Sequence, residues 1–231
     1  MDPRHSNVMQ LPIVIVNTKT YPGGTSQAAV NLAKTMEKIH LETGANLAIA
    51  VQPTDIFRIA ETVTIPVIGQ HSDSITYGSH TGWILPESIQ EAGATGALLN
   101  HSERPLHIAD IASAIARLHE VGLKAIVCAN NINVAAAVAS LKPDMVAIEP
   151  PDLIGGNISV TTAKPEIVRD AVSAVHHMNP DTAVLCGAGV KTGIDVATAL
   201  KLGTAGVLLA SGVVNAADQE KVLREMVKLS F

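Results

Sequence analysis

The stretch KAIVCANNINVAAAVASLKPDMVAIE, residues 124–149, holds one complete unit of a pattern that the whole chain repeats. Residues 124–129 and 145–149 are short runs that are apolar almost throughout, which is typical of strands covered on both faces. Residues 133–141, between them, have the length and composition of a short helix. A strand, a helix and a second strand in this order predict a parallel βαβ unit.

The same alternation runs along the chain without a linker or a low-complexity segment. Strand-length apolar runs occur at 12–17, 47–51, 66–70, 96–100, 124–129, 145–149, 183–187 and 206–209. Helical patterns fit at 26–42, 54–62, 86–92, 106–121, 133–141, 165–178, 193–202 and 217–229. A closed barrel and a doubly wound open sheet are the two main solutions for this pattern. Eight near-equal units favour the α/β class in its (β/α)8 form, the TIM barrel with eight parallel strands.

The length of 231 residues suits one large domain, and 47% hydrophobic residues are enough for a sizeable core. Only 2% of the residues are aromatic, so small and β-branched side chains must fill that core. We expect a single barrel over residues 11–231. Residues 1–10 are expected to form a flexible leader, because they lack the apolar centre of a signal peptide.

Charge and composition narrow the partners of the protein. A formal net charge of −5 argues against a general nucleic-acid binder, and the scarce aromatics leave no stacking platform for single strands. No apolar run approaches the ~20 residues that span a bilayer. We therefore expect no nucleic-acid or membrane partner and a cytoplasmic location. Cys128 and Cys186 have no metal-ligand spacing and are interpreted as buried, reduced thiols.

In both folds ligands bind at the carboxyl ends of the strands, so the residues that follow each strand matter most. Asn17 and Lys19 follow the first strand, and their spacing of two directs both to the mouth of the barrel. His101 follows the fourth strand, where an imidazole can act as acid, base or hydrogen-bond donor. Ser102 and Glu103 resemble the start of a short helix, whose positive end would disfavour the imidazolium. A solvated lysine and a surface histidine remain the alternatives.

Glu149 follows the sixth strand, and Pro150 keeps it extended. A partly desolvated carboxylate at this place is a good general base, because burial raises its pKa towards the working pH. Residues 152–157 combine an apolar tip with glycines and are typical of a lid. The alternative is an ordinary turn with an exposed glutamate. The seventh and eighth strands end in small residues that let backbone N–H groups approach a phosphate, at 187–190 and 210–213.

These motifs together resemble one family. The segments NTK (17–19), NHSER (100–104), AIEPPDLIGG (147–156), CGAG (186–189) and LLASG (208–212) are similar to those of triosephosphate isomerases, in the short archaeal-type branch. The resemblance implies interconversion of dihydroxyacetone phosphate and D-glyceraldehyde 3-phosphate through an enediolate, as in glycolysis and gluconeogenesis, with no metal and no organic cofactor. Another phosphate-binding barrel enzyme and a non-catalytic sugar-phosphate sensor remain alternatives.

The resemblance also assigns roles to residues. It implies that Glu149 is the catalytic base, that His101 is the electrophile and that Lys19, with Glu103 beside it, stabilises negative charge. Substrate binding falls to Asn17, Lys19, Ile154, Gly189, Ala210 and Ser211. The lid departs from the family pattern, with Gly155-Gly156-Asn157 in place of Gly-Thr-Gly and with Asp152 in place of glutamate.

The resemblance further implies a homodimer or homotetramer, in which the long loop of residues 71–83 docks into a neighbouring subunit beside Lys19. This loop is too long and too polar for a simple strand-to-helix turn. Trp83, the only tryptophan, closes the loop. Two interpretations are open for it, packing near Arg104 and simply covering the start of the next helix.

Overall fold

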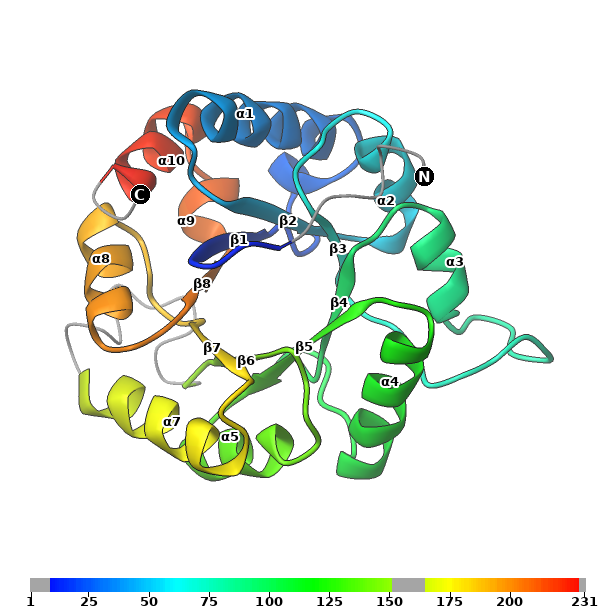
Figure 1. The fold of residues 1–231 in the computed structure, drawn as a ribbon. Coiled ribbons are helices and arrows are strands. Elements are labelled where there is room, and N and C mark those ends of the chain that lie inside the picture. Colours follow the sequence, from blue (N-terminus) through cyan, green and yellow to red (C-terminus); the bar gives the residue numbers. More distant parts are fainter. Residues whose placement is uncertain (1–8, 151–164, 229–231) are drawn as a thin grey trace.

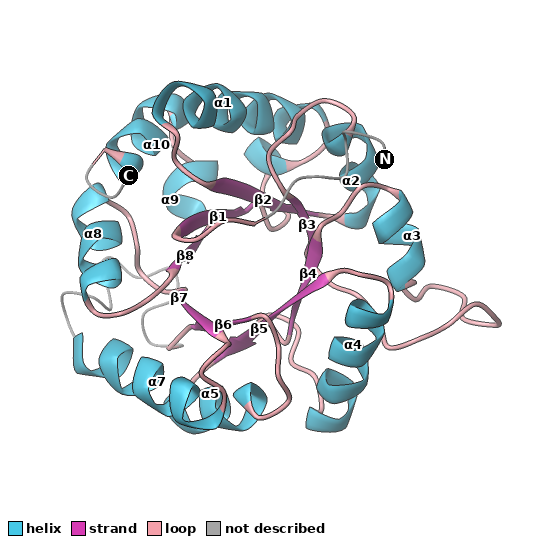
Figure 2. Ribbon diagram, viewed as in Figure 1, coloured by secondary structure: helices cyan, strands magenta, loops and turns pink. Residues whose placement is uncertain are grey.

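The computed structural model describes residues 9–150 and 165–228, and in them eight parallel strands close into a barrel in sequence order. Figures 1 and 2 look along the barrel and show the strands as an inner ring inside an outer ring of helices. The strands are β1 (Ile13–Asn17), β2 (Leu47–Val51), β3 (Val67–Gly69), β4 (Gly96–Leu99), β5 (Lys124–Ala129), β6 (Met145–Ile148), β7 (Ala183–Cys186) and β8 (Gly206–Leu209). This arrangement confirms the predicted (β/α)8 fold and excludes the open sheet.

Two layers of apolar side chains explain why each strand is apolar on both faces. One face of the strands fills the barrel interior with Ile13, Ile15, Ile68, Ile126, Leu185 and Leu208 among others, all buried. The other face packs against the helices in a larger cluster. The barrel closes where β1 pairs with β8, and there Ile13 lies beside Gly206. A Cβ atom at Gly206 would lie 2.1 Å from the Ile13 carbonyl oxygen, so this seam requires glycine.

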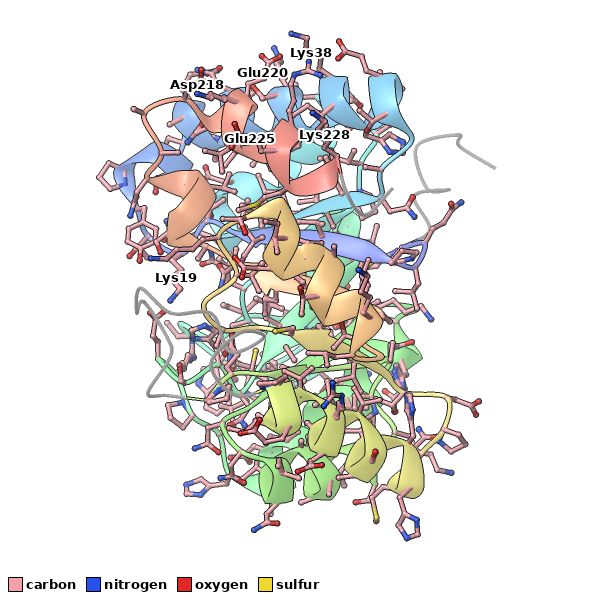
Figure 3. All side chains as sticks on the ribbon, turned by 90° about the vertical axis from the view of Figure 1, so that its left-hand side faces the viewer. Lys19, Lys38, Asp218, Glu220, Glu225 and Lys228 are labelled. Carbon is pink, nitrogen blue, oxygen red and sulfur yellow. The ribbon has the colours of Figure 1, made fainter. Side chains whose placement is uncertain are left out.

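The helices follow the predicted ranges to within a few residues. They are α1 (Gln27–Thr43), α2 (Pro53–Ala60), α3 (Pro86–Glu91), α4 (Ile108–Glu120), α5 (Ile132–Ala139), α7 (Pro165–Met178), α8 (Gly193–Lys201) and α10 (Gln219–Val227). Ion pairs join neighbouring helices of the ring, such as Lys38 of α1 with Glu220 of α10 at 2.9 Å (Figure 3). None of the described helices is long and apolar enough to cross a membrane.

Two short elements were not predicted, the 3-10 helix η2 (Pro22–Gly24) and the four-residue helix α9 (Ser211–Val214). Neither is long enough to show a helical period in the sequence. Ser26 lies at the N-cap of α1, but its side chain makes no capping bond. Its backbone N–H donates instead to Asp55 Oδ2 at 2.9 Å, with Ser26 at a φ of 54°.

The loop between β3 and α3 projects from the side of the barrel (Figure 1). Tyr77 and Trp83, both in this loop, are 70% and 57% exposed. Among the described residues the ring that contacts Trp83 is that of His80, with centroids 6.2 Å apart. Arg104 lies instead 3.9 Å from an oxygen of Asp73. The packing of Trp83 near Arg104 stays a prediction.

Candidate active site

A cavity of about 220 Å³ opens at the carboxyl ends of the strands. Most of the residues predicted from the sequence line it, namely Asn17, Lys19, His101, Glu103, Glu149, Gly189, Ala210 and Ser211. Ile154 and the predicted lid, residues 152–157, lie outside the described residues. The fold thus brings together side chains from β1, β4 and β6 and small-residue turns from β7 and β8.

Lys19 supplies positive charge to the cavity. It follows β1 in a left-handed backbone conformation, with a φ of 49°, and its N–H donates to Asn17 Oδ1 at 3.0 Å. Its ammonium group lies 2.7 Å from Glu103 Oε1. Figure 3 shows Lys19 at one end of the barrel, beyond the carboxyl end of β1. The Lys19 side chain is only 14% exposed, so its charge is held close to the cavity wall.

His101 is oriented by the backbone that follows it. The Glu103 N–H donates to His101 Nδ1 at 3.1 Å, and Nδ1 must therefore carry a lone pair. The proton of the neutral ring is then on Nε2, which lies 3.5 Å from Glu149 Oε2. Burial, and next the Lys19 cation, lower the pKa of His101, while Glu103 opposes this effect. The ring is thus a neutral N–H donor aimed into the site.

The cause of this neutrality differs from the predicted one. Ser102 and Glu103 do not begin a helix but form a turn, closed by the Arg104 N–H donating to the His101 carbonyl at 2.7 Å. Pro105 follows immediately, and a residue before proline is disfavoured in the helical region. Desolvation and the Lys19 cation lower the pKa of His101, and no helix begins at Ser102.

Glu149 is the buried acid of the site, with only 4% of its surface exposed. Its N–H donates to the Ala129 carbonyl at 2.7 Å and so continues the ladder of β6. Burial raises the pKa of Glu149 to about 7, against the opposing effects of Lys19 and of a hydrogen bond with Cys128. Oε2 has no hydrogen-bond partner within the described part of the chain. An acid with a raised pKa and an unpaired oxygen is suited to accept a proton near neutral pH.

Gly187, at the end of β7, makes room for this carboxylate. A Cβ atom at position 187 would lie 2.5 Å from Glu149 Cγ, which is closer than any two such atoms can approach. Even an alanine would therefore displace the glutamate side chain or the turn.

The small-residue turns after β7 and β8 differ in how they can hold an anion. At α8, Asp195 Oδ2 accepts from the Lys191 and Thr192 N–H groups, and the Asp195 N–H donates to Thr192 Oγ1, whereas the preceding turn at Gly189 lines the cavity. After β8, Ala210 is the N-cap residue of α9, and its side chain accepts no hydrogen bond from the first N–H groups of that helix. In the described chain the N–H groups of Ser211 and Gly212 have no backbone acceptor and lie at the cavity wall. Backbone donors arranged in this way suit an anion such as phosphate.

Several cavity neighbours were missed from the sequence. Tyr21 and Lys191 also line the cavity, and the Cys128 side chain forms a hydrogen bond with Glu149. Gln70, directly after β3, is neither an acid nor a base, so its residue type did not indicate a role in the site. Its side chain nevertheless donates a hydrogen bond to the Lys19 carbonyl. For Gln70, its position directly after a strand was the available signal. No cluster of three or more His, Cys, Asp or Glu side chains in the described ranges is arranged to hold a metal ion.

Comparison with known proteins agrees with this geometry. The sequence profile of the family described as Triosephosphate isomerase matches residues 12–228. The chain is 49% identical over 222 residues to the triosephosphate isomerase of Methanobacterium bryantii, covering 96% of this chain and 98% of the relative. It is also 49% identical over 219 residues to that of Methanothermus fervidus, covering 95% and 99%.

A crystal structure of triosephosphate isomerase from Bartonella henselae has the same fold, with a TM-score of 0.74. It is 18% identical in sequence, and the alignment covers 92% of this chain and 98% of that one. With a profile match along nearly the whole chain and curated relatives of almost equal length, the chain belongs to the triosephosphate isomerase family.

Proposed function

We propose that this protein interconverts dihydroxyacetone phosphate and D-glyceraldehyde 3-phosphate by moving a proton between neighbouring carbons, with Glu149 as the base. The observation that carries this proposal is the pairing of a buried carboxylate with a neutral imidazole N–H 3.5 Å away, at the wall of one cavity. A base that must take a proton from carbon works best when its pKa lies near the working pH, and that of Glu149 is about 7.

The reaction follows from the placement of the charges. Glu149 removes a proton from the carbon next to the carbonyl group, and negative charge develops on the carbonyl oxygen. The His101 Nε2–H donates to that oxygen, and the Lys19 cation stabilises the enediolate. Glu149, now protonated, returns the proton to the neighbouring carbon, while the hydroxyl proton passes from one oxygen of the enediolate to the other. The base is thus regenerated and no group leaves. A glutamate base with a neutral histidine is the known pattern of triosephosphate isomerases, and in this chain burial and the Lys19 cation keep His101 neutral.

The substrate phosphate would bind to the cradle of Gly189, Ser211 and Gly212, with Ala210 between strand and helix. Backbone donors suit this task, because they are fixed by the barrel and need no reorganisation when the ligand arrives. Lys19, after the neighbouring strand β1, attracts the same anion to an otherwise acidic protein, whose net charge is −5.

A coupled assay with D-glyceraldehyde 3-phosphate tests the proposed function. The wild-type protein should produce dihydroxyacetone phosphate, which a dehydrogenase and NADH then report. Absence of turnover, with inorganic phosphate still bound, would favour a sugar-phosphate sensor and contradict the proposal.

We further propose that two subunits associate through the loop of residues 71–83. A hollow of about 260 Å³ lies beside the active site and is lined by Asn17, Lys19, His71 and Arg104, among others. The same protomer presents a projecting loop with exposed Tyr77 and Trp83, so a second copy could insert its loop into this hollow. As the protein is diluted, the oligomer mass from analytical ultracentrifugation, the Trp83 fluorescence and the enzymatic activity should change together. A fully active monomer would contradict this association.

We also propose a cytoplasmic location. Cys128 and Cys186 are free and buried, as expected in a reducing compartment.

A further inference from the structure

Gln70, directly after β3, holds the turn that carries Lys19. Its side-chain nitrogen donates to the Lys19 carbonyl at 2.9 Å and lies 3.2 Å from both Asn17 Oδ1 and Thr18 Oγ1. The Ala50 carbonyl is a fourth acceptor at 3.4 Å. Two of these partners are backbone carbonyls, which can only accept, so the amide nitrogen of Gln70 must face the turn.

The Lys19 turn needs this support because its backbone is strained. A φ of 49° lies in the left-handed region, which residues other than glycine seldom adopt. Asn17 Oδ1 holds the Lys19 N–H at one side of the turn, and Gln70 binds the Lys19 carbonyl at the other. The conformation that carries the ammonium group into the cavity is thus fixed from both ends.

The same contacts fix the orientation of the Asn17 amide. Its oxygen accepts from both the Lys19 N–H and the Gln70 side chain. The Asn17 nitrogen is therefore the group left to donate to a ligand, and Asn17 lines the active-site cavity. If Gln70 were lost, the Asn17 amide could rotate and present the wrong atom.

We infer that Gln70 is a positioning residue of the active site, which sets the geometry of Lys19 and Asn17 without touching substrate. The inference rests on the proposed function, in which these two residues bind the triose phosphate. Gln70 is half-buried and lies outside both apolar clusters, so packing alone does not account for it. Three of the four acceptors near its side-chain nitrogen belong to the turn of Asn17, Thr18 and Lys19.

The experiment compares Gln70→Met with Gln90→Met as a matched control. Gln90, in α3, is half-buried like Gln70, but it lines neither the active-site cavity nor the hollow beside it, and its side chain makes no hydrogen bond within the described residues. Gln70→Met keeps the length of the side chain and removes the donor. We expect kcat/KM for D-glyceraldehyde 3-phosphate to fall about 10- to 100-fold in Gln70→Met. Gln90→Met should stay within about twofold of wild type.

Gln70→Glu provides a second variant of equal shape, in which a carboxylate would face four oxygen atoms. Gln70→Glu should lose at least as much activity as Gln70→Met. If Gln70→Met fails to fold, Gln70→Glu still tests the inference. Thermal unfolding of each variant establishes that the fold is intact. A folded Gln70 variant with wild-type kcat/KM would overturn the inference while leaving the proposed function in place, whereas an inactive wild type would overturn both.

Two readouts separate positioning from a general structural role. In a Lys19→Met background, Gln70→Met should cost much less than it does alone, because Gln70 acts through Lys19 and its turn. Hydrogen exchange at the Lys19 amide should accelerate in Gln70→Met, while amides in the barrel strands exchange as in wild type. Full additivity of the two substitutions, or unchanged exchange at Lys19, would contradict the inference.

Discussion

Replacing Glu149 by glutamine should make the folded protein more stable at alkaline pH, although it removes the catalytic base. The buried carboxyl keeps its proton up to a pKa of about 7, whereas in the unfolded chain it loses the proton near the ordinary value of 4.5. Between these values the unfolded state binds fewer protons, so the free energy of unfolding falls as pH rises, and above about 7 the loss is complete. At about 1.4 kcal/mol per pKa unit, the loss is about 3 kcal/mol.

The assay is urea unfolding of wild type and Glu149→Gln near pH 5 and near pH 8, at equal protein concentration. Glutamine stays neutral, so the stability advantage of the variant should be larger near pH 8 than near pH 5 by about 2 to 3 kcal/mol. Glu91→Gln makes the same chemical change at an exposed position of α3 and should show no such pH dependence. If the stabilities of wild type and Glu149→Gln changed in parallel between the two pH values, burial would not govern this carboxylate.

Three further predictions concern the site. The His101 ring should show no protonation step near pH 6.5 in nitrogen NMR, because burial and Lys19 lower its pKa; a normal titration would contradict its role as a neutral donor. Gly187→Ala should reduce kcat, because the added Cβ would displace the Glu149 side chain; a displacement of the carboxylate by about 1 Å would cost about 100-fold. Wild-type kinetics in this variant would show that the turn adjusts without moving Glu149. Residues 152–157, outside the described ranges, are predicted to act as a lid. A phosphate-bearing analogue of the enediolate should therefore slow hydrogen exchange at their amides, and equal exchange with and without the analogue would rule the lid out.

Much of the fold could be predicted from the sequence because strands buried on both faces have a clear pattern. The runs at 47–51, 124–129 and 206–209 coincide with β2, β5 and β8, and α7 begins and ends at the predicted residues. Helix α9 and η2 could not be predicted in this way, since four and three residues contain no full period. The helix start predicted at Ser102 is wrong because polar residues after a strand suit either a helix start or a turn, and Pro105 favours the turn.

The candidate site was partly predictable for a related reason. Parallel strands end on one side of the barrel, so Lys19, His101 and Glu149 could be expected to meet there, and the structure brings them together. Their protonation could not be deduced, because it depends on burial and on distances that only the closed barrel sets. Gln70 was missed because its importance comes from its contacts with the turn after β1, not from its own chemistry.

Proton transfer by Glu149 is the centre of the proposed mechanism, and the turnover of Glu149→Gln in the coupled assay with D-glyceraldehyde 3-phosphate tests it most directly. Glutamine preserves the shape of the side chain and the phosphate cradle, but it cannot accept the proton. We predict a fall in kcat of about 10²- to 10⁴-fold, with inhibition by inorganic phosphate unchanged. A variant that kept more than about half of the wild-type kcat would contradict the mechanism, since removal of a general base costs far more than this.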